Sequence, residues 1–196
     1  MNNRLEKQID FIMEIDRLKK IKRQTYLSDA TEKEDDAQHS WHLAVMAMLL
    51  SEYAQEKVDI LKVIKLVLIH DVIEIDAGDT YAYDEAGNAT KAEREKKAAN
   101  RIFGLLPKDQ EKEWKALWEE FEEGKTPEAK FSAALDKVQP ILLNDASGGK
   151  SWEEHHVKKS QVVKRNARTK EGSKVLWDYV EGLLEKNVKK GVLGED

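Results

Sequence analysis

The stretch Asp59-Ile-Leu-Lys-Val-Ile-Lys-Leu-Val-Leu-Ile-His-Asp71 decides how the chain folds, because it has the pattern of an apolar helix. Its apolar side chains recur at helical spacing, and Asp59 can accept hydrogen bonds from the free amides of a first turn. The β-branched residues are compatible with a strand, but the run is too long for one. The sequence therefore predicts a helix that begins after Asp59 and contains an adjacent imidazole and carboxylate, His70 and Asp71.

The rest of the sequence also predicts helices. Three prolines and ten glycines in 196 residues argue against a β protein with many turns. The expected helices cover about residues 5–18, 37–53, 92–105, 109–123, 127–143, 152–165 and 173–189, with loops at 28–36, 76–88 and 144–149. No internal repeat or linker is visible. We therefore expect one all-α domain over residues 1–196, with a core of about 17–143 and C-terminal helices within 151–190 packed on it.

Composition limits the possible functions. Charged residues make up 36% of the chain, against roughly 25% in an average protein, as expected for amphipathic helices with solvated faces. The absence of cysteine excludes disulfides and thiolate metal sites, so any metal must be held by histidine and carboxylate. A net charge of −5 argues against non-specific nucleic-acid binding. No signal peptide or apolar membrane-spanning stretch is visible, so we expect a cytoplasmic protein without a nucleic-acid or membrane partner.

Four residues form a possible metal site. His70 and Asp71 lie in an apolar helix, and Asp136 repeats this anomaly in the apolar stretch 131–143. A buried carboxylate is costly unless it is paired or bound to a cation. His39 begins a further apolar helix, so three helices can offer two imidazoles and two carboxylates to one divalent ion. Each residue alone has an ordinary explanation, as a cap, a core residue or a satisfied buried acid.

The spacing of these residues resembles a known family. Ala37-Gln-His39, Ile69-His-Asp71 and Leu135-Asp-Lys137 are similar to the H…HD…D signature of the HD-domain phosphohydrolases, a helical bundle fold. The block His70-Asp-Val-Ile-Glu-Ile-Asp-Ala-Gly-Asp79 resembles the branch that contains bacterial deoxyribonucleoside 5′-monophosphatases. The resemblance implies that His39, His70, Asp71 and Asp136 are metal ligands.

The same resemblance implies that Glu74 and Asp79 are the catalytic acid–base or water-positioning groups. Glu74 is one helical turn after Asp71, so both carboxylates are expected on one helix face. Gly78 permits a backbone turn that would aim Asp79 at the site. Without the resemblance, Glu74 would be read as a solvated helix carboxylate and Asp79 as an ordinary turn residue.

The chain departs from the family pattern at two positions. Gln38 stands where the family usually has Glu before the first ligand histidine, which could change a contact behind the metal ligands. Arg23-Gln24 stands where the monophosphatases carry an Arg-Trp pair near the N-terminus. Arg23 can still grip a phosphate, but the stacking tryptophan is missing.

Further residues are candidates for substrate binding. Lys150 and His155 lie in the segment Gly148-Gly-Lys-Ser-Trp-Glu-Glu-His155, which is similar to a segment of HD hydrolases, and Arg165 is a third candidate beside Arg23. The alternative for this segment is a glycine-containing break with Ser151 as a helix cap. His42 could support His39 or simply pack.

These features predict a metal-dependent hydrolase of a phosphomonoester such as a nucleoside 5′-monophosphate. The alternatives are a phosphodiesterase, a hydrolase of polyphosphorylated nucleotides, or a regulatory module that binds metal or nucleotide without turnover. Two imidazoles and two carboxylates favour one Mn²⁺, Fe²⁺, Co²⁺ or Ni²⁺ ion over Mg²⁺. The resemblance and the aromatic residues of the later helices, among them Trp114, Trp118 and Trp177, also suggest a homodimer, although these tryptophans could equally be core residues.

Overall fold

The computed structural model describes residues 3–79 and 89–195 and is built almost entirely of helices, as the sequence predicts. The label η marks a short 3-10 helix. In chain order the elements are α1 (Asn3–Ile15), η1 (Asp16–Lys20), β1 (Lys22–Tyr26), β2 (Lys33–Asp35), α2 (Asp36–Leu50), η2 (Ser51–Tyr53), α3 (Ile60–Ile69), η3 (His70–Ile73), α4 (Glu74–Ala77), α6 (Lys91–Phe103), α7 (Lys108–Glu123), α8 (Pro127–Ala146), α9 (Lys150–Glu154), α10 (Lys159–Arg165), α11 (Thr169–Gly172) and α12 (Lys174–Lys189).

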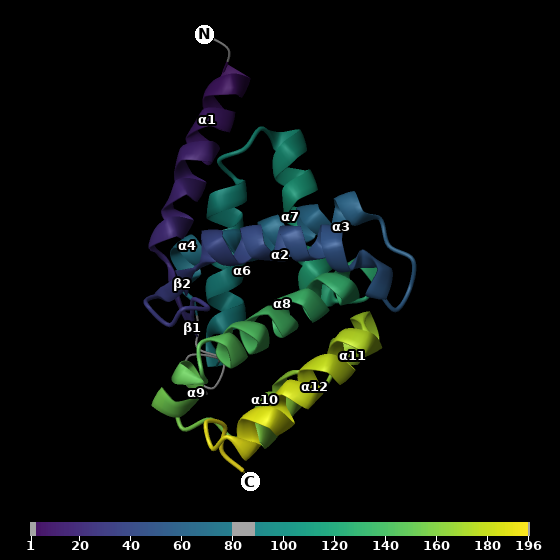
Figure 1. Ribbon diagram of the computed structural model, residues 1–196. Coiled ribbons are helices and arrows are strands. Elements are labelled where there is room, and N and C mark those ends of the chain that lie inside the picture. Colours follow the sequence, from purple (N-terminus) through teal and green to yellow (C-terminus); the bar gives the residue numbers. More distant parts are fainter. Residues whose placement is uncertain (1–2, 80–88, 196) are drawn as a thin grey trace.

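Helix α8 is the element against which much of the fold packs. It contacts α2 and α3 and, through other parts of its surface, α11 and α12, so that it lies between these two groups of helices (Figure 1). The side chains that fill this region include Leu43, Val67, Leu135 and Val180, each fully buried. Their burial removes apolar surface from water and provides the main stabilisation of the fold.

A second hydrophobic cluster joins α1, η3, α4, α6 and α7, with Phe11, Ile73, Ile102 and Trp118 among its buried residues. The chain passes from the first cluster to the second at the end of α3, because Val67 packs in the first and the segment 69–73 contributes to the second. His70 and Asp71 therefore lie where the two cores meet.

The structure confirms most of the predicted helices. Asp59 caps α3, as expected, by accepting hydrogen bonds from the backbone amides of Leu61 and Lys62. Trp118 and Trp177 are buried in the two cores, and Trp114 is partly buried with its ring edge-to-face on Phe11 at 5.0 Å between centroids. Within the described ranges, no helix is both long and apolar enough to cross a membrane.

The predicted loop at 28–36 is wrong in part, because residues 33–35 form β2, the second strand of a small antiparallel hairpin. Strand β2 pairs with β1, with Lys22 opposite Asp35 and Tyr26 opposite Lys33. The strands are only five and three residues long and mostly polar, so they lack the regular alternation by which a strand is recognised.

Four other features also differ from the predictions. His70 and Asp71 follow α3 in the 3-10 turn η3 instead of lying within the helix. The first part of the predicted loop 76–88 belongs to α4, and residues 80–88 lie outside the described residues. Helix α8 extends into the predicted break at 144–149, and the predicted helix 152–165 is two helices, α9 and α10. His156, between them, has φ of +50°, which no continuous helix can accommodate.

A glycine allows α11 to approach α8 closely, and this contact gives a test of the fold. A Cβ atom at Gly172 would lie 2.1 Å from the carbonyl oxygen of Lys130, whereas a Cβ at Gly182 in α12 would meet nothing within 4 Å. We expect Gly172→Ala to lower the free energy of unfolding by about 1–3 kcal/mol or more. Gly182→Ala, the matched control, should raise it by about 0.5–1 kcal/mol. Chemical denaturation measures both, and equal stability of the two variants would contradict the packing of α11 on α8.

Candidate metal centre

The four residues that the sequence singles out as ligands converge in space. His39 comes from α2, His70 and Asp71 from η3, and Asp136 from α8. Oδ1 of Asp136 lies 3.1 Å from Nε2 of His39 and 3.7 Å from Nε2 of His70. The carboxylate of Asp71 approaches the same two nitrogens, with Oδ1 3.2 Å from His70 and Oδ2 3.8 Å from His39.

These separations fit the shell of a single divalent ion. Two ligands at right angles around an ion, each about 2.1 Å from it, lie roughly 3 Å apart. One ligand atom each from His39, His70 and Asp136 can be chosen so that all three lie within 4.8 Å of one another. Asp71 does not belong to this group of three, because it divides its oxygens between the imidazoles, with Oδ1 near His70 and Oδ2 near His39.

Each imidazole presents Nε2 to this centre. Nδ1 of His70 lies 2.9 Å from the carbonyl oxygen of Val67, which can only accept, so Nδ1 carries the proton. Nε2 of His70 is buried and has no hydrogen-bond partner among residues 3–79 and 89–195. A buried nitrogen lone pair without a partner is costly, and a metal ion would satisfy it.

The start of α2 explains how Gln38 can stand where the family pattern has Glu. Asp35 accepts from the amide of Gln38, and the side chain of Gln38 accepts from the amide of Asp35, both at 2.9 Å. This capping box fixes the first turn of the helix, and Gln serves in it as well as Glu. The Glu-to-Gln difference from the family pattern therefore falls on a helix cap.

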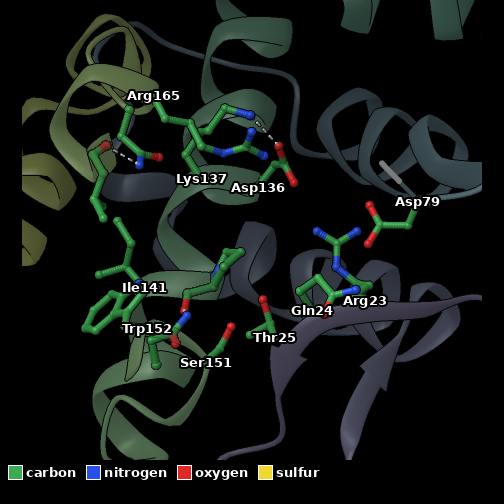
Figure 2. Close-up of a pocket in the computed structure, with 14 residues that line it drawn as sticks. Arg23, Gln24, Thr25, Asp79, Asp136, Lys137, Ile141, Ser151, Trp152 and Arg165 are labelled. Atoms are coloured by element: carbon green, nitrogen blue, oxygen red, sulfur yellow. Dashed lines mark hydrogen bonds and ion pairs between the residues drawn. The ribbon is translucent and has the colours of Figure 1, made fainter. Parts of the chain in front are cut away.

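Arg23 reaches the same centre from β1. Its Nη1 donates to Oδ2 of Asp71 at 2.8 Å and to Oδ1 of Asp36 at 3.3 Å. Figure 2 shows its guanidinium pointing toward Asp79 and Asp136. Burial disfavours its charge, but attraction from Asp71, Asp79 and Asp136 outweighs burial and raises the pKa of Arg23 above its ordinary value. Arg23 thus neutralises part of the acidic cluster.

Glu74 and Asp79 face this cluster from the segment that follows η3. Burial, and then the charges of Asp71 and Asp79, raise the pKa of Glu74 to about 10. Burial also raises the pKa of Asp79, against the opposing effect of Arg23. Gly78 adopts φ of +74°, a conformation that favours glycine, and so permits the turn expected before Asp79.

The buried carboxylates of the cluster carry more negative charge than Arg23 alone can neutralise. Burial and the charge of Asp71 raise the pKa of Asp36 to about 8. Burial and Arg23 would lower the pKa of His39, but hydrogen bonds to Asp136 and Glu34 outweigh them and raise it to about 9. Without a further cation, the buried carboxylates must bind protons to be stable. A divalent cation could replace these protons, so the carboxylates and imidazoles of the cluster suit such an ion.

A pocket extends from the centre between β1, α8, α9 and α10. It has a volume of about 100 Å³ and is lined by the charged residues Arg23, Asp79, Asp136, Lys137 and Arg165 together with uncharged polar and apolar residues. Figure 2 shows Asp136, Lys137 and Arg165 at one end and the hydroxyls of Thr25 and Ser151 at the other, with Arg23 beside Thr25. A second cavity of about 280 Å³ shares these five residues and is also lined by His70, Asp71 and Glu74.

The other predicted substrate-binding residues differ in position. Arg23 and Arg165 line both cavities, but neither lining includes Lys150 or His155 in the described part of the chain. Lys150 donates to the carbonyl oxygen of Ala30 and lies 4.1 Å above the Tyr26 ring, and His155 is exposed. The alternative role of Ser151 as a helix cap is wrong, because α9 begins at Lys150 after Gly149, and Ser151 lines the pocket.

The sequence analysis did not identify four buried or half-buried polar residues around the candidate ligands: Glu34, Asp36, Lys137 and Gln139. Glu34 and Asp36 were predicted to lie in a polar loop. However, three consecutive acidic residues at 34–36, directly before an apolar helix, indicate a possible cation site. Gln139 follows Asp136 by one turn in the same apolar stretch, and this position in the sequence indicates that its side chain is also buried. Lys137, whose Nζ lies 3.0 Å from Asp136, could have been noticed as the neighbour of a ligand.

Comparisons with known proteins agree with this geometry. The family model for the HD domain matches residues 15–177. The chain is 35% identical over 133 residues to the 5′-deoxynucleotidase HDDC2 of Mus musculus and 32% identical over 135 residues to that of Homo sapiens. These matches cover 67% and 68% of this chain, and the chain spans only 65% of the length of each curated relative.

A solved structure is more similar. The crystal structure of a protein described as a predicted metal-dependent phosphohydrolase, from Magnetospirillum magnetotacticum MS-1, superposes with a TM-score of 0.94 at 49% identity. The match covers 98% of this chain and 96% of that chain. A Pyrococcus horikoshii OT3 protein, PH0347, shares the fold with a TM-score of 0.61 at 21% identity. On the family match and this coverage, the chain belongs to the HD-domain family.

Proposed function

We propose that this chain is a metal-dependent phosphohydrolase that releases phosphate from a phosphomonoester, with a nucleoside 5′-monophosphate as the substrate class. The observation that carries the proposal is the convergence of two imidazoles and two carboxylates on one buried point, beside an arginine and a pocket. The names of its relatives, 5′-deoxynucleotidases and a metal-dependent phosphohydrolase, support the reaction class.

In this proposal His39, His70, Asp71 and Asp136 hold one divalent ion. An ion bound there would neutralise phosphate charge and activate a water molecule for attack on phosphorus. The mixed imidazole and carboxylate set suits Mn²⁺, Fe²⁺, Co²⁺ or Ni²⁺ better than Mg²⁺, which prefers oxygen ligands. Asp71 can serve the ion with Oδ1 while Oδ2 stays with Arg23, so the arginine and the ion can act together.

Three cationic side chains are placed to bind the phosphate. Arg23, Lys137 and Arg165 line both cavities next to Asp136. Arg23 and Arg165 can each hold two phosphate oxygens with one guanidinium. The nucleoside would then occupy the pocket toward Thr25 and Ser151, where hydroxyls can meet the polar groups of a sugar. Gln24, at the position of the family's stacking tryptophan, lines this pocket and offers hydrogen bonds instead.

Hydrolysis requires two proton movements. The water oxygen forms a bond to phosphorus and loses a proton, while the bond from phosphorus to the leaving oxygen breaks and that oxygen gains one. Glu74 lines only the second cavity and Asp79 lines both, so we assign the water proton to Glu74 and the leaving-group proton to Asp79. The raised pKa of Glu74 would fall beside a divalent cation, which makes this carboxylate a suitable base.

We also propose that the protein is a homodimer in the cytoplasm and acts on small molecules. Exposed apolar side chains on α2, among them Trp41, Met48 and Leu49, are suitable for contact with a second copy. The net charge of −5 supports a small-molecule substrate over nucleic acid.

A substrate panel tests the function. Purified protein loaded with Mn²⁺ should release inorganic phosphate from nucleoside 5′-monophosphates, and removal of the metal by a chelator should abolish release. His70→Ala/Asp71→Ala should retain neither metal nor activity. Hydrolysis of only phosphodiesters or polyphosphorylated nucleotides would change the substrate class, and no turnover with any of them would favour a binding module.

The variant Glu74→Gln separates chemistry from metal binding. Because Glu74 is proposed to take a proton and not to hold the ion, this variant should keep its metal while kcat falls by roughly 10²–10⁴-fold. Metal content by elemental analysis and steady-state kinetics are the two readouts. Wild-type kcat in a fully metal-loaded Glu74→Gln would remove Glu74 from the mechanism.

A further inference from the structure

A chain of buried polar side chains lies directly behind His39. Gln139 of α8 and His39 are both fully buried, and Glu34 of β2 is 1% exposed. Oε1 of Gln139 lies 3.1 Å from Nδ1 of His39, and Nε2 of Gln139 donates to Oε1 of Glu34 at 2.5 Å. A buried carboxylate thus connects to a candidate metal ligand through a single amide, and its other oxygen, Oε2, lies 3.5 Å from the same Nδ1 of His39.

The chemistry of Glu34 fixes the orientation of this amide. An ionised carboxylate can only accept hydrogen bonds, so the NH₂ group of Gln139 must face Glu34. The second N–H of the amide faces Nδ1 of His42 at 3.2 Å, which therefore accepts. Both amide protons are used in this way, and the amide oxygen is left to accept from Nδ1 of His39.

The orientation of the amide in turn selects the tautomer of His39. With its proton on Nδ1, the neutral ring has its lone pair on Nε2, the atom that lies 3.1 Å from Asp136 and 3.8 Å from Asp71. The opposite tautomer would direct an N–H at the centre and could not bind a cation there. Hydrogen bonds to the far nitrogen of a ligand histidine are known to set its ring orientation and basicity.

We propose that Gln139, held by Glu34, is the positioning residue that prepares His39 as a metal ligand through Nε2. The inference rests on the metal centre of the proposed function but concerns residues that the ligand motif does not include. It assigns His42 a supporting part, because this ring occupies the second proton of the amide. If Gln139 served only for packing, any side chain of similar shape would replace it.

The test is the affinity for Mn²⁺, measured by isothermal titration calorimetry at one fixed pH. Gln139→Met keeps the length of the side chain but removes the acceptor, so Mn²⁺ should bind 10–100-fold more weakly, as is typical when such a partner is lost. Gln139→Glu keeps an acceptor for Nδ1 of His39 and should bind Mn²⁺ nearly as tightly as the wild type or more tightly.

Asn187→Leu is the matched control. Asn187 is a fully buried amide that donates to a carboxylate, Asp145 at 2.8 Å, but it joins α12 to α8 outside the ligand cluster. This variant should retain the affinity of the wild type. Equal affinity in Gln139→Met and the wild type would overturn the proposal, and so would equal weakening in Gln139→Met and Gln139→Glu, because both results leave packing as the only role.

Two further measurements test the role of Gln139 if the variant Gln139→Glu does not fold. Glu34→Gln allows the Gln139 amide to turn over, so it should also weaken Mn²⁺ binding. In ¹⁵N spectra of the Zn²⁺-loaded wild type, Nδ1 of His39 should carry a proton; a metal bond from Nδ1 would overturn the inference. A wild type that binds no Mn²⁺ would overturn the metal centre and this inference together, whereas unchanged binding in Gln139→Met overturns the inference alone.

Discussion

The burial of carboxylates and imidazoles at one point, where two hydrophobic cores meet, is the constraint on which the rest of the structure depends. Asp36, His39, His70, Asp71 and Glu74 are all less than 9% exposed, and Oδ1 of Asp136 lies 3.1 Å from Nε2 of His39. Taking such groups from water costs several kcal/mol each unless charges and hydrogen bonds compensate. Arg23 supplies one positive charge, and a divalent ion would supply two more.

The fold provides this arrangement by bringing together elements far apart in the sequence. The hairpin places Arg23 and Glu34 beside the first turn of α2, the 3-10 turn after α3 places His70 and Asp71, and α8 places Asp136 and Gln139. A helix α3 that continued through Asp71 would distribute these side chains differently around its axis. The change to a tighter turn at η3 lies where the chain leaves one core and enters the other.

Much of the fold, and the clustering of the candidate ligands, could be predicted from the sequence because both have periodic or local signals. Helical spacing of apolar residues revealed the helices, and Asp71 and Asp136 were visible as acids in apolar stretches. The hairpin was missed because its short strands are stabilised by tertiary contacts and not by a pattern of their own. Lys150 has the charge expected of a phosphate ligand, but only the structure reveals that its amine is held by Ala30 and the Tyr26 ring.

We propose that the buried acids and histidines hold one divalent ion. The most direct measurement is a crystal structure of the Mn²⁺-loaded protein with anomalous data collected at the manganese absorption edge. We expect one strong anomalous peak within bonding distance of Nε2 of His39, Nε2 of His70, Asp71 and Asp136. An ordered cluster without a peak at full metal loading, or a peak bound elsewhere, would contradict it.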